Sequence, residues 1–460
     1  MLELRQAFGW LSGGRLIAAD PGEPPLRLTG VSTDTRAVKP GELFVALRGD
    51  SHDAHDFVDR ALAAGASALM IDRWTPACRA PLLWVGDTRR GLGEIAAGWR
   101  RRFELPVIAV TGSNGKTTVK EMIASVLGAW VGEAARLATR GNLNNDVGVP
   151  LTVLRLDATH RAAVIELGMN RPGEIAWLAR IAQARVALVN NAQREHQEFL
   201  GSVEATAREN GEAIAALPAD GVAVFPGDDA HAPLWHALAA GRRTLTFGTD
   251  AACAVRAAPA SRPDGFEMTI EGVPLPVSLA IDGAHNVRNA LAAAACCQAI
   301  GVPAATIAAG LAVFRPASGR LRRMTATTGA AVIDDSYNAN PDSVRAAIDV
   351  LAQHAAPRIL VLGDMAEVGD EGPAFHAEVG AYAKQCGIER LLAFGPASAA
   401  TAAAFGDGAE HLATIEDACW RATKLASAQA TVLVKGSRSM RMERVVRALA
   451  GADAGDGGHH

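Results

Sequence analysis

Short apolar runs alternate with alanine-rich stretches along almost the whole chain. We interpret the runs PVIAVT, AAVIEL, RVALVNN, AAVID and RILVLGD as strands, and the alanine-rich stretches between them as helices. Strands that alternate with helices are typical of parallel sheets covered by helices. The pattern therefore predicts an α/β fold throughout the chain.

Breaks in this pattern divide the chain into three units and a tail. Residues 1–100 form the first unit, which ends in the basic, helix-like segment GEIAAGWRRRFEL. The second unit covers residues 101–315 and closes at FRPASGRL, and the third covers residues 316–450. Several domains are expected, because single domains cluster at about 100–200 residues. The Gly-rich tail, residues 451–460, is expected to be disordered.

The segment VIAVTGSNGKTT, residues 107–118, places a glycine-containing loop directly after a strand. Apolar positions then follow at i, i+3, i+4, i+7 and i+8, which predicts one face of a helix beginning near Gly115 or Lys116. These positions are Val119, Met122, Ile123, Val126 and Leu127. A loop that leads into a helix N-terminus presents backbone N–H groups to phosphate oxygens, so the segment predicts a nucleotide site.

This loop departs from the usual G-x-x-x-x-G-K-[ST] pattern, because Val110 stands where that pattern has its first glycine. We interpret Val110 as the last residue of the strand, so that the loop turns on Gly112 and Gly115. Residues 112–118 are called the phosphate loop below. In such a loop Lys116 reaches the β- and γ-phosphates, and Thr117 holds Mg²⁺. The alternative is a surface turn that contains GKT by chance, and the order of strand, loop and helix argues against it.

Polar residues follow the next two strands. Glu166 ends the strand RAAVIEL at the carboxyl edge of the sheet, where open α/β proteins bind ligands, and is either a Mg²⁺ ligand or a solvent-facing glutamate. His196, in NNAQREHQEFLGS, is either a second metal ligand or a loop histidine that forms hydrogen bonds. Asn142, Asn144 and Asn145 cluster between the phosphate loop and Glu166, although asparagines of this kind often only make turns.

Composition and charge narrow the possible functions. Apolar residues make up 49% of the chain and charged residues 20%, and the formal net charge of −4 gives no basic field for nucleic acid. No segment has the ~18 uncharged apolar residues of a membrane span. Six cysteines lie scattered without metal-ligand spacing, so we expect reduced core thiols and no zinc site. We expect a cytoplasmic monomer that binds small molecules and neither nucleic acid nor membrane.

Seven segments resemble the motifs of the Mur ligase family, and they occur in the same order as in the family, over nearly the whole chain. They are TGSNGKTTVKEM, GNLNNDVGVPLTVL, VIELGMNRPGEI, NNAQREHQEFLGS, GAHNVRNALAAAA, DDSYNANPDSV and LVKGSRSMRME. Three segments, DDSYNANPDS, ELGMNRPGEI and KGSRSMRME, resemble the branch of the family that adds D-alanyl-D-alanine to UDP-N-acetylmuramoyl-tripeptide. The first unit, from VSTDTRAVKPGELF onward, is similar to the uridine-nucleotide domain of the ligases that add the third amino acid and the terminal dipeptide.

The resemblance implies three domains. They are a UDP-sugar-binding domain at 1–100, a central ATP-binding domain with a P-loop ATPase-type parallel sheet at 101–315, and a Rossmann-like C-terminal domain for the amino substrate at 316–450. The residues implied for the UDP-substrate are Ser32, Thr33, Arg36, Asn144 and Asn145.

The resemblance also implies ATP and Mg²⁺ as cofactors. Catalytic roles fall to Lys116, Glu166 and His196, and metal binding to Thr117, Glu166 and His196. The residues implied for ATP are Gly112, Ser113, Asn114, Gly115, Lys116, Thr117, Thr118, Asn286, Asn289, Arg320, Asp335, Tyr337 and Asn338. Of these, Asn286 and Asn289 would lie by the adenine, and the last four would come over the nucleotide when the C-terminal domain closes. The alternative for DDSYNANP is a polar turn between a strand and a helix.

The implied reaction forms an amide bond through an acyl phosphate. The terminal carboxylate of the tripeptide attacks the γ-phosphate of ATP, and the amine of D-alanyl-D-alanine then displaces phosphate. Lys116 and Mg²⁺ would stabilise the negative charge that develops, and domain closure would keep water from the acyl phosphate. The sequence does not indicate which group accepts the proton of the amine.

One position departs from the family pattern. Family members commonly carry a lysine in the sequence KGEI, and this lysine is carbamylated to give a negatively charged ligand at the metal site. Here the segment reads ATARENGEAI, with Asn210 in the place of the lysine, and no lysine lies between Lys120 and Lys384. An amide offers a neutral oxygen or hydrogen bonds without the charge. We expect a carbamate-independent site, with Glu209 or Glu212 as a possible source of charge, although an inactive ligase is the alternative.

Four other functions compete with this interpretation. A folylpolyglutamate synthetase-like ligase shares the loop but normally lacks a uridine-type first domain. A Mur ligase that adds the third residue usually has a D-N-P-R motif, where this chain reads NANPDS. A P-loop kinase would release ADP without needing an amine, and a regulatory module would bind ATP without turnover. The third residue of the acceptor peptide, meso-diaminopimelate or lysine, cannot be inferred from the sequence.

Overall fold

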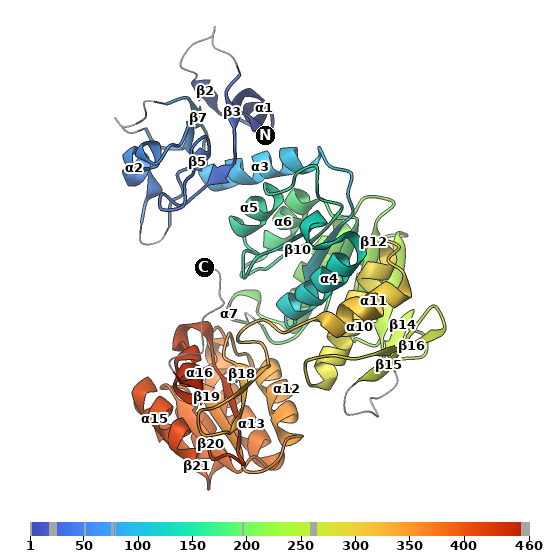
Figure 1. Ribbon diagram of the computed structural model, residues 1–460, viewed down its shortest axis with the longest axis vertical. Coiled ribbons are helices and arrows are strands. Elements are labelled where there is room, and N and C mark those ends of the chain that lie inside the picture. Colours follow the sequence, from blue (N-terminus) through green and yellow to red (C-terminus); the bar gives the residue numbers. More distant parts are fainter. Residues whose placement is uncertain are drawn as a thin grey trace.

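The computed structural model describes residues 2–17, 25–49, 52–74, 78, 80–195, 197–257 and 265–451. Three units follow one another along the chain, each with its own largely parallel sheet covered by helices (Figure 1). The predicted α/β class is therefore confirmed. The tail predicted to be disordered lies outside the described residues, apart from Gly451.

The N-terminal unit contains a five-stranded sheet. Its strands are, in spatial order, β2 (Arg15–Ile17), β7 (Leu82–Trp84), β6 (Ala68–Ile71), β5 (Leu43–Val45) and β4 (Val31–Ser32). All neighbours are parallel except β2, which runs antiparallel to β7. A short antiparallel pair, β1 (Leu2–Glu3) and β3 (Arg27–Leu28), lies beside it. The α-helices are α1 (Leu4–Gly9), α2 (Val58–Ala63) and α3 (Thr88–Arg100).

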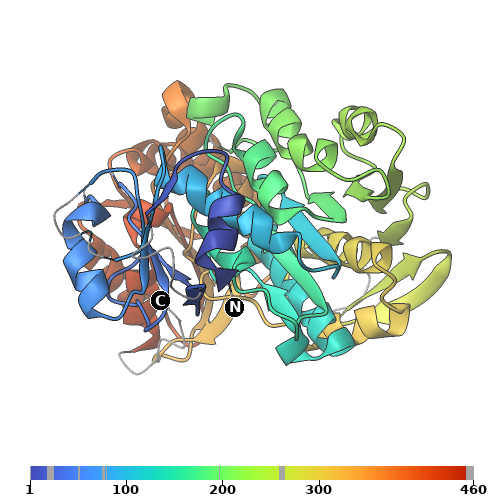
Figure 2. The same ribbon diagram turned by 90° about the horizontal axis from the view of Figure 1, so that it is seen from above.

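Helix α3 joins the N-terminal unit to the central unit. The carboxylate of Asp87 caps it by accepting hydrogen bonds from the backbone N–H groups of Arg89 and Arg90 at 2.8 and 3.1 Å. Gly93 lets the helix approach the central unit, because a Cβ at this position would lie 2.5 Å from the ring of Trp177. Buried apolar residues of both units form one continuous cluster at this junction. Figure 2 shows the N-terminal unit (blue) beside the central unit (teal to yellow) from above.

The central unit contains a nine-stranded sheet. Its strands are, in spatial order, β16 (Val273–Val277), β15 (Phe266–Ile270), β14 (Val255–Ala257), β13 (Arg243–Gly248), β12 (Val222–Pro226), β11 (Val186–Val189), β8 (Val107–Thr111), β10 (Ala162–Glu166) and β9 (Arg136–Ala138). The strands from β14 to β9 are parallel, and β15 and β16 extend the sheet as an antiparallel hairpin. The hairpin was not predicted from the sequence.

Helices cover both faces of the central sheet. One face is covered by α4 (Lys116–Val131), α10 (Ala284–Ala299) and α11 (Ala304–Val313). The other is covered by α5 (Gly148–Val153), α6 (Glu174–Ala182), α8 (Val203–Ala215) and α9 (Ala232–Ala239), while the short α7 (Gln197–Leu200) follows β11. The apolar face predicted for the first of these helices is confirmed, because all five of its residues are buried in α4.

The C-terminal unit contains a six-stranded sheet. Its strands are, in spatial order, β17 (Arg322–Thr325), β18 (Ala331–Asp335), β22 (Thr431–Lys435), β19 (Arg358–Gly363), β20 (Arg390–Phe394) and β21 (Ala409–Leu412), with only β17 antiparallel to its neighbour. The α-helices are α12 (Pro341–Ala352), α13 (Gly372–Gln385), α14 (Ser398–Phe405), α15 (Ile415–Leu425) and α16 (Glu443–Ala450).

Two predictions about composition can be checked in the structure. No helix in the described part of the chain is long and apolar enough to cross a membrane. All six cysteines are described, none of them forms a disulfide, and Cys78, Cys253, Cys296 and Cys297 are buried. The expectation of core positions is therefore confirmed for these four, while the reduced state of the thiols stays a prediction.

Candidate functional site

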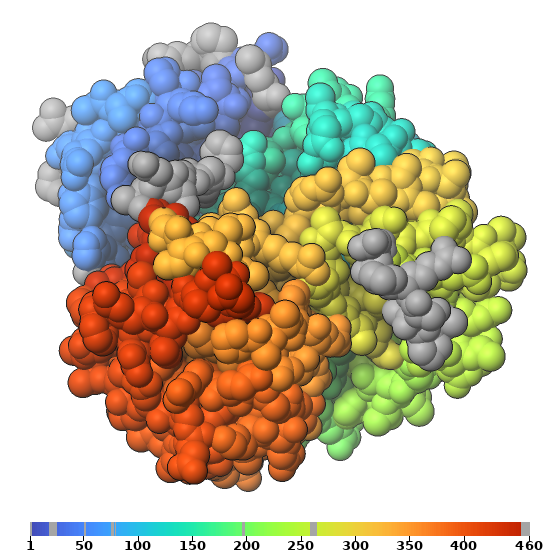
Figure 3. All heavy atoms as spheres, turned by 60° about the horizontal axis from the view of Figure 1, so that its bottom comes forward, coloured from blue at the N-terminus to red at the C-terminus, as the bar shows by residue number. Residues whose placement is uncertain are grey.

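A cavity of about 1230 Å³ lies where the three units meet. Figure 3 shows the N-terminal unit in blue, the central unit in teal to yellow and the C-terminal unit in orange to red around one face of the molecule. The cavity is lined by the phosphate loop, by the loops that follow β9 and β10, by the start of α3 and by the loops that follow β18 and β19. It brings together residues that are more than 300 positions apart in the sequence, from Arg48 to Lys435.

The phosphate loop has the predicted conformation. Val110 is paired within the sheet to Glu166 and Leu188, so it belongs to the strand β8, but the strand ends one residue later than predicted, at Thr111, which pairs with Val189. The chain then turns at Gly112 (φ +129°) and Gly115 (φ +80°), and α4 begins at Lys116. Any side chain would be strained at these φ values, and a Cβ at Gly115 would lie 2.6 Å from Asn289 Oδ1. The two glycines therefore define the short loop.

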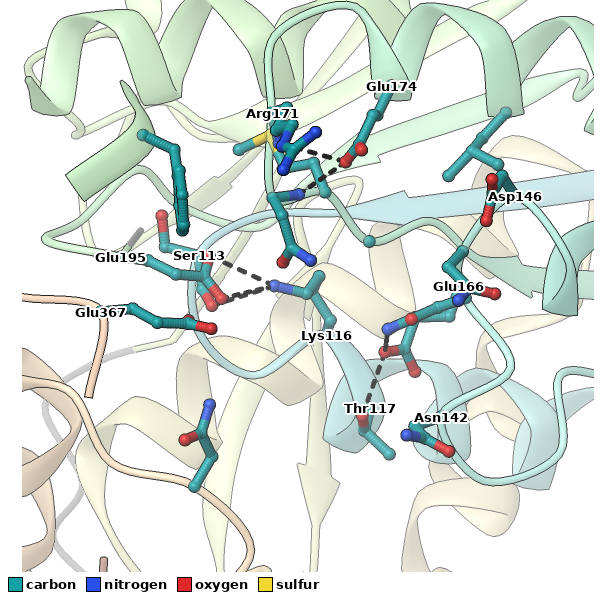
Figure 4. A pocket seen from close by; sticks show the side chains of 18 of the residues that line it. Ser113, Lys116, Thr117, Asn142, Asp146, Glu166, Arg171, Glu174, Glu195 and Glu367 are labelled. Carbon is teal, nitrogen blue, oxygen red and sulfur yellow. Dashed lines mark hydrogen bonds and ion pairs between the residues drawn. The ribbon is translucent and has the colours of Figure 1, made fainter. Parts of the chain in front are cut away.

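Lys116 points back over the phosphate loop. Its Nζ donates to the backbone oxygens of Gly112 and Ser113 at 2.6 and 3.1 Å, and forms an ion pair with Glu195 at 3.0 Å (Figure 4). The ammonium group therefore lies beside the loop that a triphosphate would occupy. Glu195 lines the same cavity and was not predicted from the sequence.

Glu166 is the carboxylate most suited to a metal ion. It is 1% exposed at the end of β10, and its Oε1 accepts hydrogen bonds from Thr117 Oγ1 at 3.2 Å and Asn144 Nδ2 at 2.8 Å. Its Oε2 is buried without a hydrogen-bond partner. A buried carboxylate oxygen of this kind fits a divalent cation, and Figure 4 shows Glu166 and Thr117 facing each other.

The set of protein ligands at this place is small. No group of three or more His, Cys, Asp or Glu side chains that could hold a metal ion occurs among the described residues. His196, predicted as a further ligand, lies outside the described residues. A site with one carboxylate and one hydroxyl suits Mg²⁺ together with nucleotide phosphates, because Mg²⁺ commonly takes one or two carboxylates plus substrate oxygens.

Asn210 lies directly behind the phosphate loop. It is 1% exposed in α8, and its Oδ1 accepts a hydrogen bond from the backbone N–H of Gly112 at 2.9 Å. Its Nδ2 is buried without a hydrogen-bond partner. The neighbouring Glu209 accepts hydrogen bonds from the backbone N–H groups of Gly173 and Ile175 at the start of α6. Its carboxylate is thus engaged as a cap of that helix.

Further predicted ATP residues form a buried network behind the loop. Asn190 Nδ2 donates to the backbone oxygen of Asn114 and to Asn289 Oδ1, and Asn289 Nδ2 donates to Asn286 Oδ1. Asn286 and Asn289 are 2% and 5% exposed and do not line the cavity. Ser113 accepts a hydrogen bond from the N–H of Gln193 at 2.9 Å. Thr118 lies buried in the first turn of α4.

The C-terminal unit contributes the opposite wall. The guanidinium of Arg320 lies 4.0 Å from the ring centroid of Tyr337, and both line the cavity with Asn338. Lys435, which was not predicted, donates to Asp335 Oδ2 at 2.6 Å and to the backbone oxygen of Asn338 at 2.9 Å. Asp335 holds this lysine and is not itself part of the cavity wall.

Of the residues predicted for the UDP-substrate, only Asn144 and Asn145 line the cavity. Ser32 and Thr33 lie at and just after β4, and Arg36 forms an ion pair with Asp34 at 2.7 Å. The first unit instead contributes Asp87 and three arginines that the sequence reading missed: Arg48, Arg89 and Arg90. For Asp87, Arg89 and Arg90 the available signal was the segment DTRR, a capping residue followed by a basic pair at a helix start; Arg48 lies outside this segment.

The fold and the cavity define a multidomain nucleotide-dependent enzyme, and family models identify which one. The model described as Mur ligase family, catalytic domain matches residues 27–100, Mur ligase middle domain matches 110–297, and Mur ligase, glutamate ligase domain matches 319–438. The chain belongs to the Mur ligase family.

Individual relatives are more specific. The chain is 43% identical over 442 residues to UDP-N-acetylmuramoyl-tripeptide–D-alanyl-D-alanine ligase of Escherichia coli (strain K12), covering 95% of this chain and 96% of the relative. A crystal structure of MurF from Acinetobacter baumannii superposes with a TM-score of 0.90 at 32% identity, over 97% and 98% of the two chains. MurF ligase from Thermotoga maritima in complex with ADP gives 0.82 at 26% identity, over 92% and 97%.

Proposed function

We propose that this chain is the ATP-dependent ligase that joins D-alanyl-D-alanine to UDP-N-acetylmuramoyl-tripeptide, a step of peptidoglycan precursor synthesis. The cavity lined by all three units carries this proposal. An amide ligase of this type must bring a phosphate donor, a carboxylate and an amine together, and one cavity with the phosphate loop on its wall meets that need. The names of the relatives specify the two substrates.

Within this proposal, the phosphate loop and Lys116 bind the triphosphate. Attack by the peptide carboxylate on the γ-phosphorus places negative charge next to Lys116 Nζ, which stabilises it electrostatically. Glu195, which forms an ion pair with this Nζ at 3.0 Å, competes with the phosphates for it. Thr117, Glu166 and His196 would hold Mg²⁺, which when bound supplies further positive charge for the phosphates.

The N-terminal and C-terminal units bind the other two substrates. The UDP-sugar is assigned to residues 1–100, with Ser32, Thr33 and Arg36, and to Asn144 and Asn145 of the central unit at 101–315. The amine is assigned to the C-terminal unit at 316–450, where Arg320, Tyr337 and Asn338 face the nucleotide side of the cavity. Asn286 and Asn289 are assigned to the adenine through the network behind the loop. Since ATP and UDP-sugars are made inside the cell, we place the reaction in the cytoplasm.

The test is ADP release with ATP, Mg²⁺ and UDP-N-acetylmuramoyl-tripeptide, with and without D-alanyl-D-alanine. We expect ADP release to depend on the dipeptide and to match, mole for mole, the formation of a UDP-muramoyl-pentapeptide in the mass spectrum. ADP release that is indifferent to the dipeptide would indicate a kinase and defeat the proposal. Parallel assays with meso-diaminopimelate and lysine in the third position define the acceptor.

A further inference from the structure

The loop of residues 190–195, which follows β11, contacts two parts of the molecule at once. On one side it contacts the phosphate loop: Asn191 Oδ1 accepts a hydrogen bond from the N–H of Asn114 at 2.8 Å, and Glu195 pairs with Lys116. On the other side, Arg194 contacts the C-terminal unit. Figure 1 shows α7, which follows this loop, next to that unit.

Arg194 is held by carboxylates from two helices of the C-terminal unit. Its backbone N–H donates to Asp342 Oδ2 at 2.9 Å, and its guanidinium donates to Asp342 Oδ1 at 2.6 Å. The same guanidinium donates to Glu378 Oε2 at 2.7 Å and Oε1 at 3.1 Å. It also lies 5.1 Å from the ring centroid of Phe375. Asp342 is in the first turn of α12, and Glu378 is in α13.

These contacts have the features of a strong ion pair. The side chains of Arg194, Asp342 and Glu378 are 24%, 23% and 31% exposed, so solvent screens them less than a surface pair. A guanidinium that donates two parallel hydrogen bonds to a carboxylate is also fixed in direction. The carboxylates raise the pKa of Arg194 well above its usual range, and Arg194 lowers the pKa of Glu378.

A second contact reaches the same end of α12. Asn340, the N-cap of this helix, exchanges hydrogen bonds with the side chain of Asn114 in the phosphate loop, at 2.8 and 3.3 Å. The start of α12 is thus fixed at two residues. Asn340 binds the phosphate loop through Asn114, and Asp342 binds Arg194 in the neighbouring loop. The wall residues Tyr337, Asn338 and Ala339 directly precede this helix start.

We propose that Arg194 is a positioning residue for the ligation, which holds the start of α12 against the phosphate loop and thereby sets the C-terminal wall of the cavity. The inference rests on the proposed function, because the proposed function assigns the amine substrate to the C-terminal wall of the cavity. Arg194 does not line the cavity itself, so it acts through the segment before α12 and through Glu195. Arg194, Asp342 and Glu378 together form a latch between the two units, and this latch prepares the C-terminal wall for the amine.

The test compares three variants of the full chain. Arg194→Ala removes the latch, and Arg194→Lys keeps the charge without the fork that joins two carboxylates. Arg345→Ala is the matched control, because Arg345 donates to Glu378 at 2.9 Å and lies over Tyr382, both within the C-terminal unit. The readouts are KM for each substrate, kcat, and the radius of gyration from small-angle X-ray scattering of the substrate-free protein.

For Arg194→Ala we expect a larger radius of gyration and a rise of about tenfold or more in KM for D-alanyl-D-alanine, since a misplaced substrate wall costs about this much. KM for the UDP-tripeptide should stay within about twofold, because that wall is not moved. For Arg194→Lys, both values should lie between those of Arg194→Ala and the unaltered protein, and Arg345→Ala should match the unaltered protein. Unchanged scattering together with unchanged KM for the dipeptide in Arg194→Ala would overturn the inference. If the unaltered protein needs no dipeptide, the proposed function fails, while scattering still decides the role of Arg194.

Discussion

Asn210 shows how one residue can take a different role in a shared site. In the family pattern that this chain resembles, the position holds a lysine that acquires negative charge by carbamylation. Here the amide oxygen already accepts the hydrogen bond of Gly112, and the side chain is 1% exposed. The residue therefore fixes the phosphate loop from behind and brings no charge. Neither of the two glutamates predicted as a source of charge lines the cavity; Glu209 caps α6, which leaves Glu212 to be tested.

We predict that Asn210→Ala lowers stability by about 1–3 kcal/mol, because the buried N–H of Gly112 loses its acceptor. KM for ATP should rise as the loop loosens. Thermal unfolding and steady-state kinetics measure the two effects, with Glu204→Gln as the control, because Glu204 lies on the same helix and its side chain is 73% exposed. Activity of the unaltered protein should be the same in bicarbonate-depleted buffer. A strong bicarbonate requirement would contradict the carbamate-independent site, and a loss of activity in Glu212→Gln would assign the charge to that residue.

Helices α4 and α11 illustrate how packing between elements escapes a sequence reading. Gly310 lies where the two helices cross, and a Cβ there would be 2.5 Å from Val126 Cα. The backbone oxygen of Gly310 also accepts a hydrogen bond from Ser125 at 2.7 Å. The glycine therefore allows the backbones of α4 and α11 to come into direct contact. Helix α4 follows the phosphate loop, so this contact supports the loop from below.

We predict that Gly310→Ala destabilises the central unit by about 1–3 kcal/mol, because the added methyl group forces the two helices apart. Urea unfolding measures this loss. Gly9→Ala is the control, since Gly9 ends helix α1 and nothing lies within 4 Å of its Cβ position. Equal stability of the two variants would show that α11 shifts away from α4 without cost.

Elements with a strong local pattern were predictable. The strand β8, the helix α4 and the place of Glu166 at the end of β10 follow from periodicity and chain order, which depend on neighbouring residues alone. The hairpin of β15 and β16 was missed although FEMTI alternates apolar and polar residues throughout, because that segment is only five residues long and its partner VPLPV contains two prolines.

Contacts between units were not predictable, because nothing local signals them. Arg194 meets Asp342 and Glu378 across 148 and 184 positions, and each of these residues alone reads as a solvated surface charge. Within the C-terminal unit, Lys435 reaches Asp335 across 100 positions on the neighbouring strand, and no local pattern signals this pair either. The candidate site was therefore predicted best in the phosphate loop and least in the walls that the outer units supply.

At the scale of the whole molecule, Asp282 links the central unit to the C-terminal unit. It precedes α10, and its carboxylate lies 3.4 Å from His354 Nε2 and accepts a hydrogen bond from Arg323 Nε at 2.7 Å. His354 and Arg323 together lower the pKa of Asp282 to about 2, from an ordinary value of 3.8. The carboxyl group is 27% exposed, so the pair is partly shielded from solvent.

A pKa that is lower in the folded state stabilises the fold only while the carboxylate is charged. The contribution is fully present above the unfolded value near 3.8 and is lost as pH falls through about 2. The difference between the two values corresponds to about 2 kcal/mol at most. We therefore predict that Asp282→Asn lowers the thermal midpoint most at about pH 6, and about half as much near pH 3, where part of the carboxylate is already protonated.

The control for this experiment is Asp220→Asn. Asp220 pairs with Arg185 at 3.0 Å, but the two side chains are 64% and 59% exposed, so its loss should change the midpoint little at any pH. Thermal scans of the three proteins between about pH 3 and pH 6 give the comparison. A deficit in Asp282→Asn that stays constant over this range would mean that the contact between the units does not depend on the charge of Asp282. A deficit that shrinks as the pH falls would identify ionised Asp282 as a charge-dependent link between them.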